Sequence, residues 1–164
     1  MARMGTFILL SAIPGSGKST WAREYQRVHP NTYIVASDEV RCRVSGAIQN
    51  FEHEDLVWAT FLKEINDHAG EDCTVIADAT NVQNRFRHYY REATPGFDHH
   101  VLVVFKIPFE ICMKQNKTRE HSRVVCDEAM YKLRDEYEEV GSDIIDLYDE
   151  YIVVDESYDE QHIK

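Results

Sequence analysis

Residues 12–20 read Ala-Ile-Pro-Gly-Ser-Gly-Lys-Ser-Thr, and the fold of the chain can be predicted outward from this stretch. It fits the phosphate-binding pattern G-x-x-x-x-G-K-[ST], the Walker A motif, except that Ala12 takes the first glycine position. Gly15 and Gly17 allow backbone N–H groups to turn inward around a phosphate at a helix N-terminus. An ordinary glycine-rich turn would carry Lys18 and Ser19 only by coincidence. The stretch therefore predicts a P-loop.

A P-loop predicts a site for ATP or another nucleoside triphosphate. Lys18 would reach the β- and γ-phosphates and act in catalysis, and the Ser19 hydroxyl would ligate Mg²⁺. The residues of the loop that we expect to bind the nucleotide are Pro14, Gly15, Ser16, Gly17, Lys18, Ser19 and Thr20.

Short apolar runs on both sides of the P-loop predict an α/β fold. They lack period-2 alternation, as expected of strands that are buried on both faces of a parallel sheet. Stretches with helical spacing lie between them, so strands alternate with helices. We therefore expect a P-loop NTPase-type parallel sheet of about five strands, with helices on both faces and a helical lid. The runs are Thr6–Ala12, Thr32–Ala36, Cys73–Ala77, Val101–Ile107 and Tyr151–Val154.

The overall composition indicates one globular domain over residues 1–164. The chain is 43% hydrophobic, which is enough to build a core, and it contains no repeat or linker-like stretch. Its longest apolar runs fall far short of the roughly 20 residues needed to span a bilayer. The four cysteines form no C-x-x-C pair, which indicates free thiols in a reducing cytoplasm rather than disulfides or a zinc site.

The net charge of −11 argues against a nucleic-acid partner until the charges are located along the chain. Residues 81–126 hold eight Lys and Arg against four Asp and Glu, whereas residues 127–164 hold three against fourteen. The net charge is thus equal to that of the acidic C-terminal third. We expect the basic segment to lie at the acceptor channel and lid, and the acidic third to lie away from that channel. An acidic third that lines the channel would favour a small-molecule substrate.

Two predicted strands end in aspartate, at Asp38 and at Asp78. The carboxyl ends of parallel strands meet at one sheet edge, so both carboxylates should face the P-loop. Phosphoryl transfer needs one carboxylate to orient a hydroxyl and take its proton, and another near Mg²⁺. Asp38 suits the first role and Asp78 the second. Either residue alone could be a helix N-cap, but two of them beside a P-loop favour the catalytic interpretation.

The cation-rich segment from Lys114 to Arg123 is expected to belong to a lid, at about residues 114–126. A mobile basic segment can close over the donor and neutralise charge on the transferred group. A solvated connection between two helices is the alternative. Arg119 is the first candidate for donor binding and catalysis, and Arg123 is the second. Trp58 and Phe61 have helical spacing and are interpreted as core residues.

With these residues in place, the chain resembles the P-loop 5′-hydroxyl polynucleotide kinases of bacteriophage and bacterial end-healing systems, over roughly residues 4–140. Residues 14–24 look like the P-loop and helix of that family, and Ser-Asp-Glu-Val-Arg at 37–41 matches its Asp-x-x-Arg motif. The resemblance implies that Asp38 is the general base on the 5′-hydroxyl and that Arg41 contacts phosphate at the reaction centre. It also assigns Asp78, Thr80 and Asn81 to the acceptor side, and Asn116 and Arg119 to the lid motif.

The resemblance implies ATP-dependent phosphorylation of a 5′-hydroxyl end of DNA or RNA, in the cytoplasm or, for a phage protein, the host cytoplasm. The chain departs from the family pattern at three positions, Ala79, Gln115 and Cys126. With the acidic total, the first two departures motivate an alternative, a P-loop kinase acting on a nucleoside, sugar or antibiotic hydroxyl. A third alternative is a nucleotide-dependent switch without acceptor chemistry.

Overall fold

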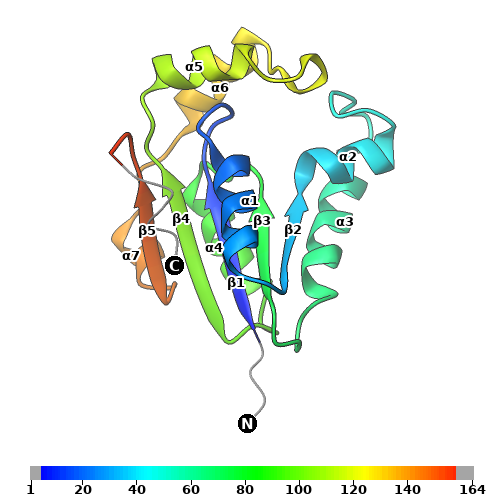
Figure 1. Ribbon diagram of the computed structural model, residues 1–164, viewed down its shortest axis with the longest axis vertical. Coiled ribbons are helices and arrows are strands. Elements are labelled where there is room, and N and C mark those ends of the chain that lie inside the picture. Colours follow the sequence, from blue (N-terminus) through cyan, green and yellow to red (C-terminus); the bar gives the residue numbers. More distant parts are fainter. Residues whose placement is uncertain (1–4, 158–164) are drawn as a thin grey trace.

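The computed structural model describes residues 5–157, which form a five-stranded sheet with helices on both faces (Figure 1). All strand pairs are parallel, and the strand order is β2-β3-β1-β4-β5. This arrangement confirms the predicted α/β fold with a parallel sheet. Every residue of β1 is buried, as the continuous apolar run predicts for a central strand. The strands are β1 (Thr6–Ser11), β2 (Thr32–Ala36), β3 (Thr74–Asp78), β4 (His99–Phe105) and β5 (Glu150–Val154).

Helices connect the strands and cap the carboxyl edge of the sheet, and none in residues 5–157 has the length and apolar character needed to cross a membrane. They are α1 (Lys18–Val28), α2 (Ser37–Ser45), α3 (Glu54–Asn66), α4 (Asn84–Glu92), α5 (Phe109–Lys117), the 3-10 turn η1 (His121–Arg123), α6 (Asp127–Glu136) and α7 (Ser142–Ile145).

One difference from the expected elements concerns the end of β2. The strand expected to reach Asp38 stops at Ala36, and α2 follows at once. Asp38 and Glu39 in its first turn suit the positive end of the helix dipole, and Gly46 ends it with a φ of 88°. Helix α6 ends at Glu136, since the backbone then turns so that the Glu138 N–H donates to the Val82 carbonyl at 2.8 Å.

The two faces of the sheet carry separate hydrophobic cores. One face packs Phe7, Leu9 and Leu102 against the helices α2, α3, α4 and α7, with Phe61 fully buried among them as predicted. The other face packs Ile8 and its neighbours against α1. Both layers leave the carboxyl ends of the strands free at the top of Figure 1, where α5, η1 and α6 lie above them.

Arg87 of α4 is fully buried and ties four chain segments together. Its Nε–H donates to Ser11 Oγ at 3.1 Å, and its other N–H groups donate to Asn84 Oδ1 and to the Val82 and Glu138 carbonyls at 2.8–3.3 Å. Burial lowers the pKa of this guanidinium. The residue comes from the basic middle segment, yet its hydrogen bonds give it a structural role.

Replacing Arg87 with leucine is expected to lower the free energy of unfolding by about 3 kcal/mol, because its buried partners would lose their donors. Urea unfolding measures the effect. Arg85→Leu on the same helix is the matched control, since Arg85 is exposed and its replacement should change stability by no more than about 0.5 kcal/mol. Equal losses in the two variants would contradict the structural role.

Candidate active site at the carboxyl edge of the sheet

Two adjoining cavities lie at the carboxyl edge of the sheet, beneath the lid segment (residues 114–126). The first, which we call the donor cavity, has a volume of about 610 Å³ and lies over the P-loop between β1 and α1. The second, the acceptor cavity, has a volume of about 360 Å³ and extends from β3 toward α2, α3 and α6. Four residues line both cavities and mark the junction between them: Lys18, Ser19, Arg119 and Arg123.

The P-loop has the backbone shape that its two glycines predict. Gly15 and Gly17 have φ values of 83° and 91°, in the left-handed region that side chains disfavour. A Cβ atom at Gly15 would lie 2.2 Å from the Cys112 carbonyl oxygen, so glycine is also needed for α5 to pack here. A Cβ atom at Gly17 would have no atom outside the neighbouring residues within 4 Å, and Gly17 lines the donor cavity.

The donor cavity gathers most of the residues expected to bind the nucleotide. From the P-loop it takes all of them except Pro14, which lines the acceptor cavity instead. Across from the loop, Gln115, Arg119 and Arg123 close the cavity from the lid segment. The cavity therefore combines the glycine-rich loop with two lid arginines, an arrangement suited to polyphosphate.

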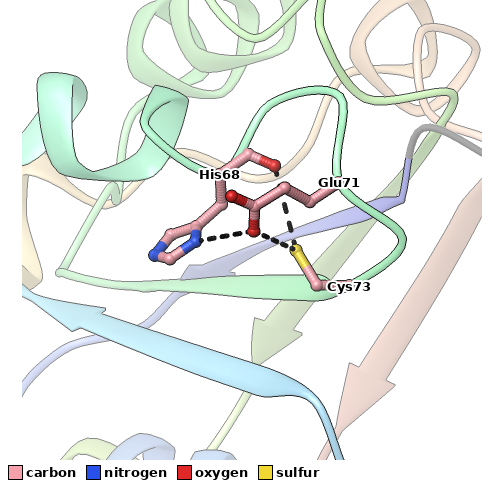
Figure 2. A group of neighbouring side chains, drawn as sticks. All are labelled: His68, Glu71 and Cys73. Carbon is pink, nitrogen blue, oxygen red and sulfur yellow. Dashed lines mark hydrogen bonds and ion pairs between the residues drawn. The ribbon is translucent and has the colours of Figure 1, made fainter.

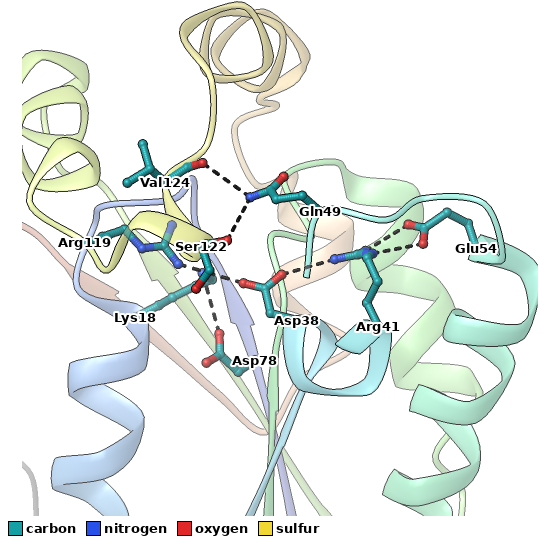
Figure 3. A network of polar contacts seen from close by, with 9 residues as sticks. All are labelled: Lys18, Asp38, Arg41, Gln49, Glu54, Asp78, Arg119, Ser122 and Val124. Atoms are coloured by element: carbon teal, nitrogen blue, oxygen red, sulfur yellow. Dashed lines mark hydrogen bonds and ion pairs between the residues drawn. The ribbon is translucent and has the colours of Figure 1, made fainter. Parts of the chain in front are cut away.

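Asp78 ends β3 as predicted and points at the P-loop. Its Oδ2 accepts a hydrogen bond from Ser19 Oγ at 2.8 Å. Figure 3 shows its ion pair with Lys18, whose Nζ lies 3.7 Å from Asp78 Oδ1. Within residues 5–157, Asp78 Oδ1 and Ser16 Oγ are buried and lack hydrogen-bond partners. A buried carboxylate oxygen and a neighbouring hydroxyl fit the oxygen ligands that Mg²⁺ prefers, so Ser19 and Asp78 could hold that ion beside a polyphosphate.

Asp38 lies in the first turn of α2, where an arginine one turn later holds its carboxylate. Arg41 is 6% exposed and lies 3.1 Å from Asp38 Oδ1. Its Nε–H and an Nη2–H donate to the two carboxylate oxygens of Glu54, both at 2.9 Å. The Phe51 ring lies over this guanidinium, 4.7 Å from centroid to Cζ. Figure 3 shows the Asp38–Arg41–Glu54 series beside Lys18 and Asp78.

Arg119 reaches the same carboxylate from the lid segment, with Nη2 3.9 Å from Asp38 Oδ2. Burial lowers the pKa of Arg119, while nearby Asp38 acts in the opposite direction. Asn116 fixes the lid segment: its side chain donates to the Val125 carbonyl at 2.7 Å and accepts from the Val125 N–H at 3.0 Å. This pairing gives the Asn116 position of the lid motif a structural role.

The acceptor cavity has an aromatic wall and a helical wall. Phe51 and Trp58 line it from the α2–α3 side, so the interpretation of Trp58 as a core residue was incomplete. Ala129, Lys132, Leu133 and Glu136 of α6 line the opposite side. The expectation that residues 127–164 lie away from this cavity is therefore wrong for α6. The two charged side chains among these four pair with each other at 3.8 Å, and the last seven residues of the acidic third lie outside the described part of the chain.

The basic segment 81–126 does not gather at the acceptor cavity, contrary to expectation. Arg87 is part of the core, and the Arg91 Nε–H donates to the Leu147 carbonyl at 2.7 Å. Lys106 pairs with Glu139 at 3.0 Å. Of the eight Lys and Arg residues in this segment, only Arg119 and Arg123 line the cavity. The cations of this one sequence segment are thus divided between α4, the position directly after β4 and the lid segment.

Two of the three acceptor-side residues at and after the end of β3 reach the acceptor cavity. Asp78 and Thr80 line it, together with the intervening Ala79. Asn81 instead is buried with a φ of 45°, and its amide donates to the Leu10 carbonyl at 3.1 Å. This bond joins the loop after β3 to the end of β1, so Asn81 supports the site from behind.

Glu54 and Gln49 are site residues that the motifs did not indicate. Glu54 binds Arg41 from the first turn of α3, thirteen positions further along the chain. The Gln49 amide donates to the Ser122 and Val124 carbonyls at 3.5 and 3.3 Å, and so links the α2–α3 loop to the lid segment (Figure 3). An acidic residue near the start of a helix after the Asp-x-x-Arg motif is the one sequence signal available for Glu54.

Comparison with known proteins identifies the family and the fold. A family model described as an AAA domain matches residues 8–140. A search of curated protein sequences finds no match.

Solved structures with the same fold include RNA-related proteins and a gluconokinase. The chain is similar to a chain of the Pnkp1/Rnl/Hen1 RNA repair complex, with 22% identity and a TM-score of 0.72 over 83% of this chain and 45% of that one. It is similar to a fungal RNA kinase, with 16% identity and a TM-score of 0.65 over 100% and 80%. It is also similar to a gluconokinase from Sinorhizobium meliloti, with 17% identity and a TM-score of 0.63 over 98% and 88%.

Proposed function

The chain belongs to the AAA domain family and has the fold of P-loop kinases, and from this premise we propose that it phosphorylates the 5′-hydroxyl end of a polynucleotide, DNA or RNA. ATP or another nucleoside triphosphate would be the phosphoryl donor. We further propose that the described residues, 5–157, form one kinase domain in which residues 114–126 are the lid.

The observation that carries the proposal is the shared wall of the two cavities. Lys18, Ser19, Arg119 and Arg123 line both, and Asp38 lies on the acceptor side of this junction. A γ-phosphoryl group held by the P-loop would therefore face a hydroxyl held beside Asp38. Phosphoryl transfer requires the attacking hydroxyl and the γ-phosphoryl group to face each other in line, and adjoining cavities are compatible with that requirement.

In the proposed reaction, Asp38 accepts the proton of the acceptor hydroxyl as its oxygen attacks the γ-phosphorus. The bond between the γ-phosphorus and the β–γ bridging oxygen breaks, and the diphosphate leaves with that electron pair. Arg41, held by Glu54, orients the Asp38 carboxylate. Lys18 and Arg119 neutralise charge on the transferred group. Mg²⁺, which Ser19 and Asp78 would hold, supplies further charge neutralisation when bound.

Three observations support a nucleotide as the acceptor. The acceptor cavity, about 360 Å³ in volume, lies at the small end of ligand cavities, which suits one terminal nucleotide better than a duplex. Its aromatic wall, Phe51 and Trp58, suits stacking of a base. Arg123 and Lys132 line the same cavity and could contact the phosphates of the following strand.

A small-molecule hydroxyl is the second candidate, and particular features favour it. Helix α6 of the acidic third lines the acceptor cavity, and most cations of the basic segment lie elsewhere. Arg41 is already bound by two carboxylates, Asp38 and Glu54, which leaves it less available to an acceptor phosphate. The similarity to a gluconokinase is in line with this reading.

Acceptor assays with labelled ATP distinguish the two candidates. We expect label transfer to 5′-hydroxyl DNA or RNA oligonucleotides and to nucleoside 3′-phosphates. With about two phosphate contacts, the oligonucleotide KM should rise about sevenfold between roughly 50 and 200 mM salt. The KM of an uncharged nucleoside is the control and should change little. Transfer to a sugar or nucleoside without transfer to any oligonucleotide would overturn the polynucleotide proposal and leave the kinase intact.

A further inference from the structure

A second cluster of chemically reactive side chains lies at the opposite edge of the sheet from the P-loop. His68, Glu71 and Cys73 come from the turn that joins α3 to the start of β3. Figure 2 shows the Glu71 carboxylate lying between the His68 ring and the Cys73 sulfur. The proposed phosphoryl transfer uses none of these residues.

The three ligand atoms lie close to the spacing of a metal site. His68 Nδ1 and Glu71 Oε2 are 3.2 Å apart, Glu71 Oε2 and Cys73 Sγ are 4.0 Å apart, and all three atoms lie within 4.8 Å of one another. A tetrahedral zinc ion with bonds of about 2.0–2.3 Å needs ligand atoms roughly 3.3–3.6 Å apart. Shifts on the order of 1 Å would therefore bring these atoms around one ion.

The chemistry of the donor set points to a particular class of ion. An imidazole nitrogen, a carboxylate oxygen and a thiolate sulfur are the three protein ligand types of Zn²⁺, whereas Mg²⁺ and Ca²⁺ prefer oxygen alone. The sequence predicted no zinc site because no two cysteines are close, but one cysteine suffices when a histidine and a glutamate complete the set. We propose that His68, Glu71 and Cys73 bind a zinc-type divalent cation through Nδ1, Oε2 and Sγ.

The surroundings hold the ligands in place before an ion arrives. The His68 ring stacks on Tyr33 of β2, with centroids 3.9 Å apart and an interplanar angle of 14°. Gly70 turns the chain with a φ of 86°, and the Glu71 N–H donates to the His68 carbonyl at 3.2 Å. Cys73 is buried, while His68 and Glu71 are partly or fully open to solvent, which leaves room for water as a fourth ligand.

Binding at this site would join the end of α3 to β3 and β2 without touching the catalytic edge. The ion takes the place of the thiol proton, which passes to solvent, and the imidazole binds with its remaining proton on Nε2. We expect the site to stabilise the folded chain. Occupancy of the site should leave the KM values for donor and acceptor unchanged. The proposal of a metal site therefore stands or falls independently of the proposed kinase reaction.

Titration of the chelator-treated full chain with Co²⁺, then Zn²⁺, tests the proposal. We expect a cobalt–thiolate charge-transfer band in the near ultraviolet that saturates at one ion per chain and disappears when Zn²⁺ is added. Cys73→Ser should abolish the band, and His68→Gln should weaken Co²⁺ binding about tenfold or more. The proposed magnesium ligands, Ser19 and Asp78, contain no sulfur, so an ion there would not produce this band.

Two matched variants separate a built site from general metal binding. His29→Gln removes a histidine that also stacks on a tyrosine, Tyr25, at 4.0 Å, and Cys42→Ser removes an exposed thiol. Both should keep the band and the Co²⁺ affinity of the unchanged chain. Absence of the band in the unchanged chain at saturating Co²⁺, or its survival in Cys73→Ser, would overturn the proposal. If Cys73→Ser does not fold, an unchanged Co²⁺ affinity in His68→Gln would overturn the proposal.

Discussion

Asp38→Asn is expected to lower kcat by about 10²–10⁴-fold, the usual contribution of a positioned general base. Asparagine keeps the size of the side chain and can still accept a hydrogen bond from Arg41, which lies 3.1 Å from Asp38 Oδ1. It cannot take the proton of the acceptor hydroxyl. Because the P-loop and the acceptor walls are untouched, the KM for ATP and the KM for the acceptor should change far less than kcat.

Glu39→Gln is the matched control for this variant. Glu39 lies next to Asp38 in the first turn of α2, where it has the same interaction with the helix dipole, but it is exposed and lines neither cavity. Its kcat should equal that of the unchanged chain. An unchanged kcat in Asp38→Asn would show that Asp38 is not the general base. The nucleotide-dependent switch instead predicts that the unchanged chain transfers no phosphoryl group to any acceptor.

Arg119→Ala is expected to lower kcat by about 10³-fold, as does the loss of an arginine that neutralises a transferred phosphoryl group. Arg119 lines both cavities and is largely buried, and its guanidinium lies 3.9 Å from Asp38. Burial lowers the pKa of Arg119 because it removes water from the charged guanidinium. A phosphoryl group beside this poorly hydrated cation would therefore be stabilised strongly. Steady-state kinetics with saturating ATP measures the effect on kcat.

Lys117→Ala removes one positive charge from the same lid segment and serves as the control. Lys117 is exposed, is the last residue of α5 and lines neither cavity, so its kcat should be unchanged. Arg119→Lys keeps the charge without the planar fork and should fall between the two. If Arg119→Ala and Lys117→Ala lower activity equally, Arg119 contributes only to the net charge of the lid segment.

The P-loop and the sheet could be predicted because their signals are local. Gly15 and Gly17 must adopt positive φ values, and Lys18 and Ser19 follow them in a fixed order at the start of α1. The apolar runs are short and nearly continuous, as expected of strands in a parallel sheet. The central strands β1, β3 and β4 are almost fully buried, whereas the edge strands β2 and β5 are partly exposed. Asp78 was placed correctly for the same reason, because it directly follows a run of this kind.

The partners of the site residues were decided only by the tertiary structure. Glu54 meets Arg41 because α2 and α3 pack together, and Gln49 meets the lid segment across more than seventy positions of sequence. No spacing rule covers such contacts, since they depend on how the helices pack on the sheet. Asp38 was assigned to a strand end because its position in the first turn of α2 depends on where β2 stops.

The sequence by itself determined a P-loop, a parallel sheet and two carboxylates at its edge, because backbone constraints and continuous burial act on neighbouring residues. Only the tertiary structure decided which charges reach the site. Among the basic residues of segment 81–126, Arg87 became part of the core and Arg119 part of the junction between the cavities. Packing of α6 against the acceptor cavity brought part of the acidic third to the site, with its charge paired internally. Whether a charged side chain reaches the site depends on the partners that folding brings to it, and these partners lie far away in sequence.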